Sequence, residues 1–166
     1  MFADLFDGAL AVVANAKSEL PKEINWELLV VIPNGAPVGA EMAKLLMKKP
    51  KAIRIDKKLN DMGLIESLNI SIPDLISTNH IIVCDDGVET GTAALGIAKK
   101  LESMGAKHLV LIAPVIPREI EPRLLGSYKQ LISASRPIAR RALKWEYRDF
   151  SPLTLEAATE LLGLER

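Results

Sequence analysis

Short apolar runs along the chain predict a series of buried strands. The run at 28–33 (LLVVIP) is continuous and rich in β-branched residues, which is typical of a strand covered on both faces. Another such run occupies 80–84 (HIIVC). Further runs of strand length lie at 52–55, 107–113 and 130–133. These five segments are the expected strands of one sheet.

The segments between these runs show helical periodicity. Apolar residues three and four positions apart predict helices over 5–20, 37–46 and 94–104, where Gly105 is placed to cap the last of these. A shorter helix is expected within 116–125, and a final one begins at Ser151 and Pro152.

Alternating strands and helices predict an α/β fold, in which a mainly parallel, twisted sheet lies between two layers of helices. No internal repeat or linker divides the sequence, so residues 1–166 are expected to form a single domain. The segment 59–79 is harder to assign. Its part 65–72 alternates weakly between apolar and polar residues, as a strand or one half of a hairpin would.

Composition excludes several classes of protein. The chain carries 21 Lys plus Arg and 21 Asp plus Glu, and this zero net charge argues against a general binder of nucleic acid or anionic membranes. Its single cysteine, Cys84, allows no intrachain disulfide and no cysteine metal cluster. No apolar run is long enough to span a bilayer, and the N-terminus lacks the pattern of a signal peptide. We therefore expect a cytoplasmic protein.

The segment after the strand 80–84 carries the richest chemistry. It reads Asp85, Asp86, Gly87, Val88, Glu89, Thr90, Gly91 and Thr92, and a helix follows it. The first amides of a helix lack partners within the helix and bind phosphate readily. Two carboxylates beside them suit the vicinal hydroxyls of a sugar, so a sugar 5′-phosphate is the expected ligand. The turn at Asn34, Gly35 and Ala36 should lie at the same edge of the sheet.

Other phosphate motifs fit this segment less well. A Walker loop requires a lysine after the glycine, and the dinucleotide fingerprint GxGxxG is absent from the sequence. An acidic turn with a threonine N-cap would explain one Asp-Gly or Thr-Gly pair, but not the complete segment between a strand and a helix.

The segment IIVCDDGVETGTA (81–93) resembles the motif with which type I phosphoribosyltransferases bind phosphoribosyl pyrophosphate (PRPP). The segment 30–43 resembles the first strand, the pyrophosphate loop and the next helix of this family, and 145–162 resembles the C-terminal end of bacterial and archaeal members. The resemblance implies a C-terminal hood and a Mg²⁺-dependent transfer of ribose 5-phosphate from PRPP to a nitrogenous base. It also implies a homodimer.

Carried onto this sequence, the resemblance implies that Asp85 and Asp86 contact the ribose hydroxyls and, indirectly, the metal ion. It implies that residues 88–92 hold the 5′-phosphate. Glu89 would act in proton transfer, which gives a weak preference for a purine as the acceptor.

Two features depart from the family pattern. The turn of Asn34, Gly35 and Ala36 has no basic residue, so Lys57 and Lys58 could supply the positive charge, unless they are simply a solvated pair. The segment 59–79 is short for a closing loop, which leaves open a regulatory domain that binds PRPP or a nucleotide without turnover.

In the hood, Trp145 and Tyr147 could stack on the base, or could instead pack the last helix.

Overall fold

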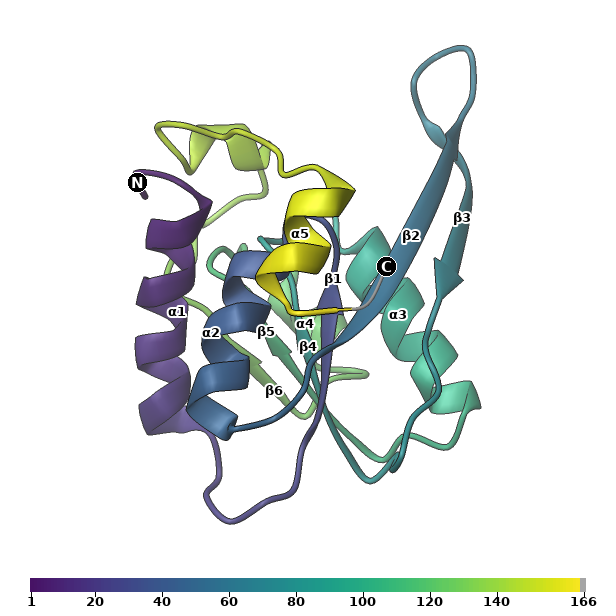
Figure 1. The fold of residues 1–166 in the computed structure, drawn as a ribbon. Coiled ribbons are helices and arrows are strands. Elements are labelled where there is room, and N and C mark those ends of the chain that lie inside the picture. The colour runs from purple at the N-terminus through teal and green to yellow at the C-terminus, as the bar shows by residue number, and fades with distance from the viewer. Residues whose placement is uncertain (165–166) are drawn as a thin grey trace.

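A central sheet with the strand order β3-β2-β1-β4-β5-β6 organises the computed structural model, which describes residues 1–164 (Figure 1). The strands are β1 (Glu27–Val31), β2 (Lys51–Leu59), β3 (Ile65–Ser71), β4 (His80–Cys84), β5 (His108–Ile112) and β6 (Gln130–Ile132). All neighbouring pairs are parallel except β2 and β3, which are antiparallel. The predicted α/β class with a mainly parallel sheet is confirmed.

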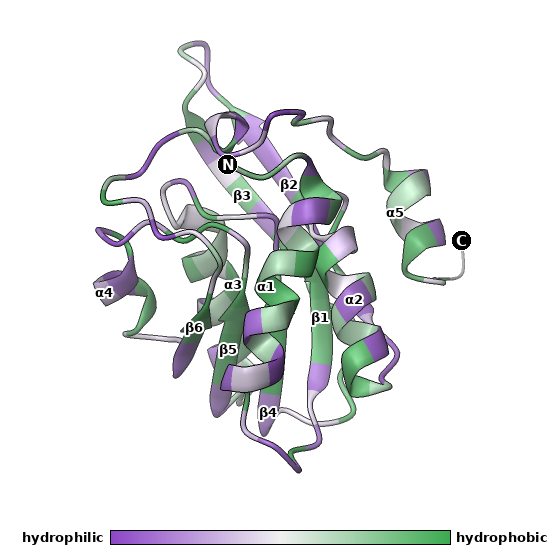
Figure 2. Ribbon diagram, turned by 90° about the vertical axis from the view of Figure 1, so that its left-hand side faces the viewer, coloured by the Kyte–Doolittle hydropathy of each residue, from purple (hydrophilic) through white to green (hydrophobic). Residues whose placement is uncertain are grey.

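Helices cover both faces of the sheet because alternate strand residues point to opposite sides. On one face, Leu28 and Val30 of β1 pack with α1 (Leu5–Glu19), α2 (Ala36–Leu46) and α5 (Leu155–Leu161). On the other face, Leu29 and Val31 pack with α3 (Thr92–Ser103) and with Leu124 of α4 (Glu121–Leu124). Figure 2 shows α1 and α2 side by side in front of the apolar strands.

The segment 59–79 contains the second strand of a hairpin. The strand predicted at 52–55 continues to Leu59 as β2, and β3 returns antiparallel to it. The side chain of Asn60 closes the turn, because its Oδ1 accepts hydrogen bonds from the amides of Met62 and Leu64. This hairpin projects beyond the rest of the sheet (Figure 1). Because solvent surrounds the hairpin, its strands carry many polar residues, and the apolar pattern that predicts a strand is weak there.

The last helix begins later than the sequence suggested. It starts at Leu155 rather than at Ser151 or Pro152, because the hydroxyl of Thr154 accepts a hydrogen bond from the amide of Ala157 and caps the helix there.

Two shorter elements complete the fold. The helix expected within 116–125 is limited to α4. A single 3₁₀ turn, Leu143–Trp145, lies in the C-terminal segment. Within residues 1–164, every helix is too short or too polar to cross a bilayer.

Candidate functional site

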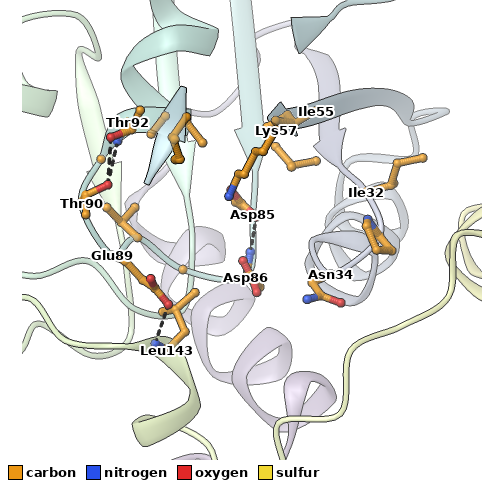
Figure 3. A pocket seen from close by; sticks show the side chains of 18 of the residues that line it. Ile32, Asn34, Ile55, Lys57, Asp85, Asp86, Glu89, Thr90, Thr92 and Leu143 are labelled. Carbon is orange, nitrogen blue, oxygen red and sulfur yellow. Dashed lines mark hydrogen bonds between the residues drawn. The ribbon is translucent and has the colours of Figure 1, made fainter. Parts of the chain in front are cut away.

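A cavity of about 430 Å³ lies where β1 and β4 end at the carboxyl edge of the sheet. The loop 85–92 lines one part of it, and residues 31–34 after β1 line another. Ile55 and Lys57 on β2 and Leu143 of the C-terminal segment also line it (Figure 3). The remaining lining residues are Ile65 of β3, Ala93 and Ala94 of α3, and Phe150 of the C-terminal segment. The two loops that the sequence placed at one edge of the sheet therefore do share one site.

The start of α3 offers free amides to this cavity. Gly91 is the N-cap, with no side-chain hydrogen bond, and its carbonyl accepts the first helical bond from the amide of Leu95. In the described part of the chain, the amides of Thr90, Gly91 and Ala93 donate no hydrogen bond. Unpartnered amides at the positive end of a helix dipole form an anion site.

Glycine is required at the N-cap position of α3. The φ angle of Gly91 is +85°, and a Cβ atom there would lie 2.9 Å from Cγ2 of Ile120. The hydroxyls of Thr90 and Thr92 flank this glycine and lie 2.9 Å apart, bonded to each other. A bound phosphate could accept one hydrogen bond from each hydroxyl in place of the bond between the two hydroxyls.

The acid pair leaves the end of β4 beside this loop. Asp86 is only 9% exposed, and its amide donates to Oδ1 of Asp85 at 2.8 Å. Burial raises the pKa of Asp85, and the neighbouring charge of Asp86 raises it further. Burial also raises the pKa of Asp86. Two crowded carboxylates of this kind are stabilised by hydroxyl donors or by a cation.

Only one of the two predicted lysines lines the cavity. Lys57 and Lys58 are successive residues of β2, so their side chains point to opposite faces of the hairpin. Lys57 lies in the cavity wall, and Figure 3 shows its amino group directed toward Asp85. Its charge opposes the rise in the pKa of that carboxyl. Lys58 faces away from the site.

The predicted pyrophosphate loop contributes less than the sequence suggested. Of its three residues, Asn34 lines the cavity, and its Oδ1 accepts a hydrogen bond from the amide of Leu153 at 2.9 Å. Gly35 allows close packing, because a Cβ atom there would lie 2.3 Å from the carbonyl oxygen of Val31. Ala36 is fully buried at the start of α2.

The C-terminal segment contacts the loop 85–92 at several points. Oε1 of Glu89 accepts the amide of Leu143 at 2.9 Å (Figure 3). The side chain of Leu143 packs so closely on Gly87 that a Cβ atom on this glycine would lie 2.4 Å from Cδ2 of the leucine. The segment thus positions the loop as well as lining the cavity.

Neither aromatic residue proposed for base stacking faces the cavity. Tyr147 is 3% exposed, its hydroxyl donates to the carbonyl of Asp86 at 2.7 Å, and its ring packs between Phe2 and Phe150. It packs against the N-terminal region of the chain rather than the last helix. Trp145 is 58% exposed, with Nζ of Lys144 5.3 Å from its ring centre.

The apolar side chains that do reach the cavity from the hood are Leu143 and Phe150. Sequence reasoning missed both. Phe150 carried a usable signal, since it is a third aromatic in the segment that contains Trp145 and Tyr147. Leu143 carried none, because nothing in its local sequence distinguishes it from a core leucine.

One curated protein is similar to this chain in sequence. Orotate phosphoribosyltransferase from Archaeoglobus fulgidus is 26% identical over 129 residues, which are 78% of this chain and 70% of that protein. No family model matches the chain.

Solved structures share the fold at lower identity. TT1426 from Thermus thermophilus superposes with a TM-score of 0.72 at 18% identity, over 97% of both chains. Purine phosphoribosyltransferase from Pyrococcus horikoshii gives a TM-score of 0.57 at 15% identity, over 87% of this chain and 91% of that one. A hypothetical protein from Neisseria gonorrhoeae with bound ppGpp gives 0.55 at 11% identity, over 98% and 97%.

The fold is that of the type I phosphoribosyltransferases, and the resemblance drawn from the sequence is confirmed. In sequence, the chain is similar to an archaeal orotate phosphoribosyltransferase.

Proposed function

We propose that this protein binds PRPP and transfers its ribose 5-phosphate to a nitrogenous base, with release of pyrophosphate. The observation that carries this proposal is the meeting, in one cavity, of the open amides of α3 and the carboxylates of Asp85 and Asp86. A phosphate alone would be repelled by the two acids. A phosphorylated sugar would use both halves of the site, with its phosphate at 88–92 and its hydroxyls at the acid pair.

In the proposed reaction, the bond between the anomeric carbon and pyrophosphate breaks, and pyrophosphate leaves with the electron pair. A nitrogen of the base then bonds to this carbon and gives up a proton. Carboxylates near the sugar would stabilise the positive charge that develops on it. We propose Glu89 as the proton acceptor, because the amide of Leu143 holds its Oε1 and leaves Oε2 for the base.

Magnesium fits the proposed site as a companion of the substrate. Among residues 1–164, no three His, Cys, Asp or Glu side chains lie close enough to hold a metal ion by themselves. The protein would therefore contribute only Asp85 and Asp86, which would hold the ion directly or through the ribose or water. Ligand phosphates and water would complete its shell, as is usual for this ion. When bound, it would supply positive charge to the leaving pyrophosphate.

The proposed activity can be tested with purified protein. Calorimetry with PRPP and Mg²⁺ measures binding, and a pyrophosphate-release assay across purines, pyrimidines and other bases measures turnover. Purines are the first class to screen, because of the carboxylate at Glu89. Binding together with base-dependent release of pyrophosphate supports the transferase. The absence of any PRPP binding would contradict it.

A regulatory domain that binds PRPP or a nucleotide without turnover is the second candidate. Two observations favour it: the pyrophosphate loop lacks a basic residue, and one oxygen of Glu89 is already bonded to Leu143. A structural neighbour with bound ppGpp is compatible with such a role. Tight binding with no pyrophosphate release from any base would support this candidate over the enzyme.

We also propose a homodimer. Phe6 and Leu10 are 48% and 59% exposed on α1 and give apolar surface that a second copy could cover. Light scattering should then give twice the chain mass of 18.1 kDa, and the mass of one chain would contradict the dimer.

A further inference from the structure

The main chain of Asp86 is held from outside the ligand cavity by the side chain of Tyr147. The tyrosine hydroxyl donates to the carbonyl of Asp86 at 2.7 Å, and this bond is buried. The amide of Asp86 donates to Oδ1 of Asp85 at 2.8 Å, so the two acids are bonded to each other. The direction of both carboxylates therefore depends on where the ring of Tyr147 lies.

The first residues of the chain fix the position of this ring. Phe2 packs against Tyr147, with the two ring centres 5.5 Å apart. On α1, a Cβ atom at Gly8 would lie 3.0 Å from Cε1 of the tyrosine, so the helix backbone is already in close contact with the ring. Because a packed interior has little free space, the loss of the Phe2 ring would leave a gap into which Tyr147 can move.

Phe2 is itself held by main-chain hydrogen bonds to the C-terminal segment. Its amide donates to the carbonyl of Glu146 at 2.9 Å, and its carbonyl accepts the amide of Arg148 at 2.8 Å, in a parallel β-bridge. One residue later, the carbonyl of Ala3 accepts the amide of Asp149 at 2.9 Å. Residues 2 and 3 thus form a short extra strand along the C-terminal segment, and the N-terminus lies beside this segment in Figure 1.

Phe2 and Tyr147 can act on a ligand only through other residues. Within residues 1–164, the lining of the cavity includes Asp85 and Asp86 but neither of these two aromatic residues. We propose that Phe2 and Tyr147 are positioning residues: the strand of residues 2 and 3 fixes the tyrosine, and its hydroxyl orients the acid pair toward the hydroxyls of the ligand's sugar. This inference rests on the proposed function, since it requires that the acid pair binds the sugar.

The test compares two sugar phosphates that differ in one hydroxyl. Ribose 5-phosphate and 2-deoxyribose 5-phosphate present the same phosphate to α3, but only the first offers a 2-hydroxyl to the carboxylates. NMR titrations that follow the amide signals of the loop 85–92 give both dissociation constants. We expect the wild type to prefer ribose 5-phosphate by roughly 10- to 100-fold, the range of a hydrogen bond to a charged group. A purely structural role would weaken both probes alike and leave this preference unchanged.

Two substitutions remove successive parts of the proposed support. Tyr147→Phe removes only the hydroxyl, and Phe2→Ala removes the ring that packs against it. We expect each to reduce the preference for ribose 5-phosphate to less than about threefold. Because Phe2 acts through the hydroxyl of Tyr147, the double variant should lose no more of the preference than Tyr147→Phe alone.

Tyr128→Phe is the matched control. The hydroxyl of Tyr128 is also buried and also donates to a main-chain carbonyl at 2.7 Å, but this carbonyl belongs to Ala94 of α3. Its loss should cost a similar amount of stability, and the preference for ribose 5-phosphate should stay at the wild-type value.

Full preference for ribose 5-phosphate in Tyr147→Phe would overturn the inference, as would an equal loss of preference in Tyr128→Phe. Loss in Tyr147→Phe with full preference in Phe2→Ala would overturn the role of Phe2. If Phe2→Ala does not fold, Phe2→Val takes its place, with the same two outcomes. Wild-type protein that binds both sugar phosphates equally, or neither of them, would instead overturn the sugar contact of the proposed function, and this inference with it.

Discussion

The acid pair should lower the stability of the ligand-free protein. Burial raises the pKa of both Asp85 and Asp86, so the folded protein holds the charged forms of these carboxyls less easily than the unfolded chain does. Each unit of such a shift corresponds to about 1.4 kcal/mol. We expect Asp85→Asn with Asp86→Asn to raise the free energy of unfolding at pH 7 by on the order of 1–3 kcal/mol.

The pH dependence of this gain has a definite sign. For a carboxyl with a raised pKa in the folded state, the penalty is full above the folded pKa and disappears below the unfolded pKa, where both states are protonated. The stability difference between variant and wild type should therefore shrink as the pH falls from about 7 toward about 4, the ordinary range of a carboxyl pKa. Urea unfolding of both proteins across this range measures it.

Asp61→Asn provides a control for the loss of a carboxylate, because Asp61 is exposed in the turn of the hairpin. It should leave the free energy of unfolding within about 0.5 kcal/mol of the wild type. A double variant that is less stable than the wild type at pH 7 would show that the acid pair does not destabilise the fold, as would a stability gain that does not depend on pH.

Three further changes test other parts of the structure. Gly91→Ala places a Cβ atom on a residue with a positive φ angle and against Ile120, so it should lower stability by about 1–3 kcal/mol and weaken phosphate binding. Thermal unfolding measures the loss of stability, and an unchanged melting temperature would contradict it. Tyr147→Phe leaves the carbonyl of Asp86 without its buried donor, and urea unfolding should show a loss of about 1–3 kcal/mol; a loss below about 0.5 kcal/mol would contradict it. Burial, His80 and Lys129 lower the pKa of His108, so the free energy of unfolding should fall as the pH drops below about 6.5. His108→Gln should reduce this dependence on pH in urea unfolding, and an unchanged dependence would show that His108 does not cause it.

The sequence predicted the sheet well because its central strands are buried on both faces. Such strands read as continuous apolar runs, and the runs at 28–33 and 80–84 became β1 and β4. The hairpin was harder to predict. Exposed residues such as Lys57 and Lys58 break the apolar pattern of β2, and the strand depends on its antiparallel pairing with β3.

The site could be predicted where its residues are adjacent in the sequence. The loop 85–92 carries its carboxylates, glycine and hydroxyls in one segment, so the strand before it and the helix after it were enough to place it. The contributions of Asn34, Tyr147 and Phe150 depend on contacts between distant segments. Local pattern carries no information on such contacts, so the sequence left Tyr147 open between stacking on the base and packing the last helix, whereas its hydroxyl bonds to the carbonyl of Asp86 and its ring contacts Phe2.

Binding of PRPP with Mg²⁺ to the wild type and to the double variant Asp85→Asn, Asp86→Asn tests whether the acid pair holds the ribose. We expect calorimetry to show clear binding to the wild type and at least about tenfold weaker binding to the double variant, whose fold should be intact by circular dichroism. Equal affinity of the two proteins for PRPP would contradict it, because the carboxylates would then not hold the ribose.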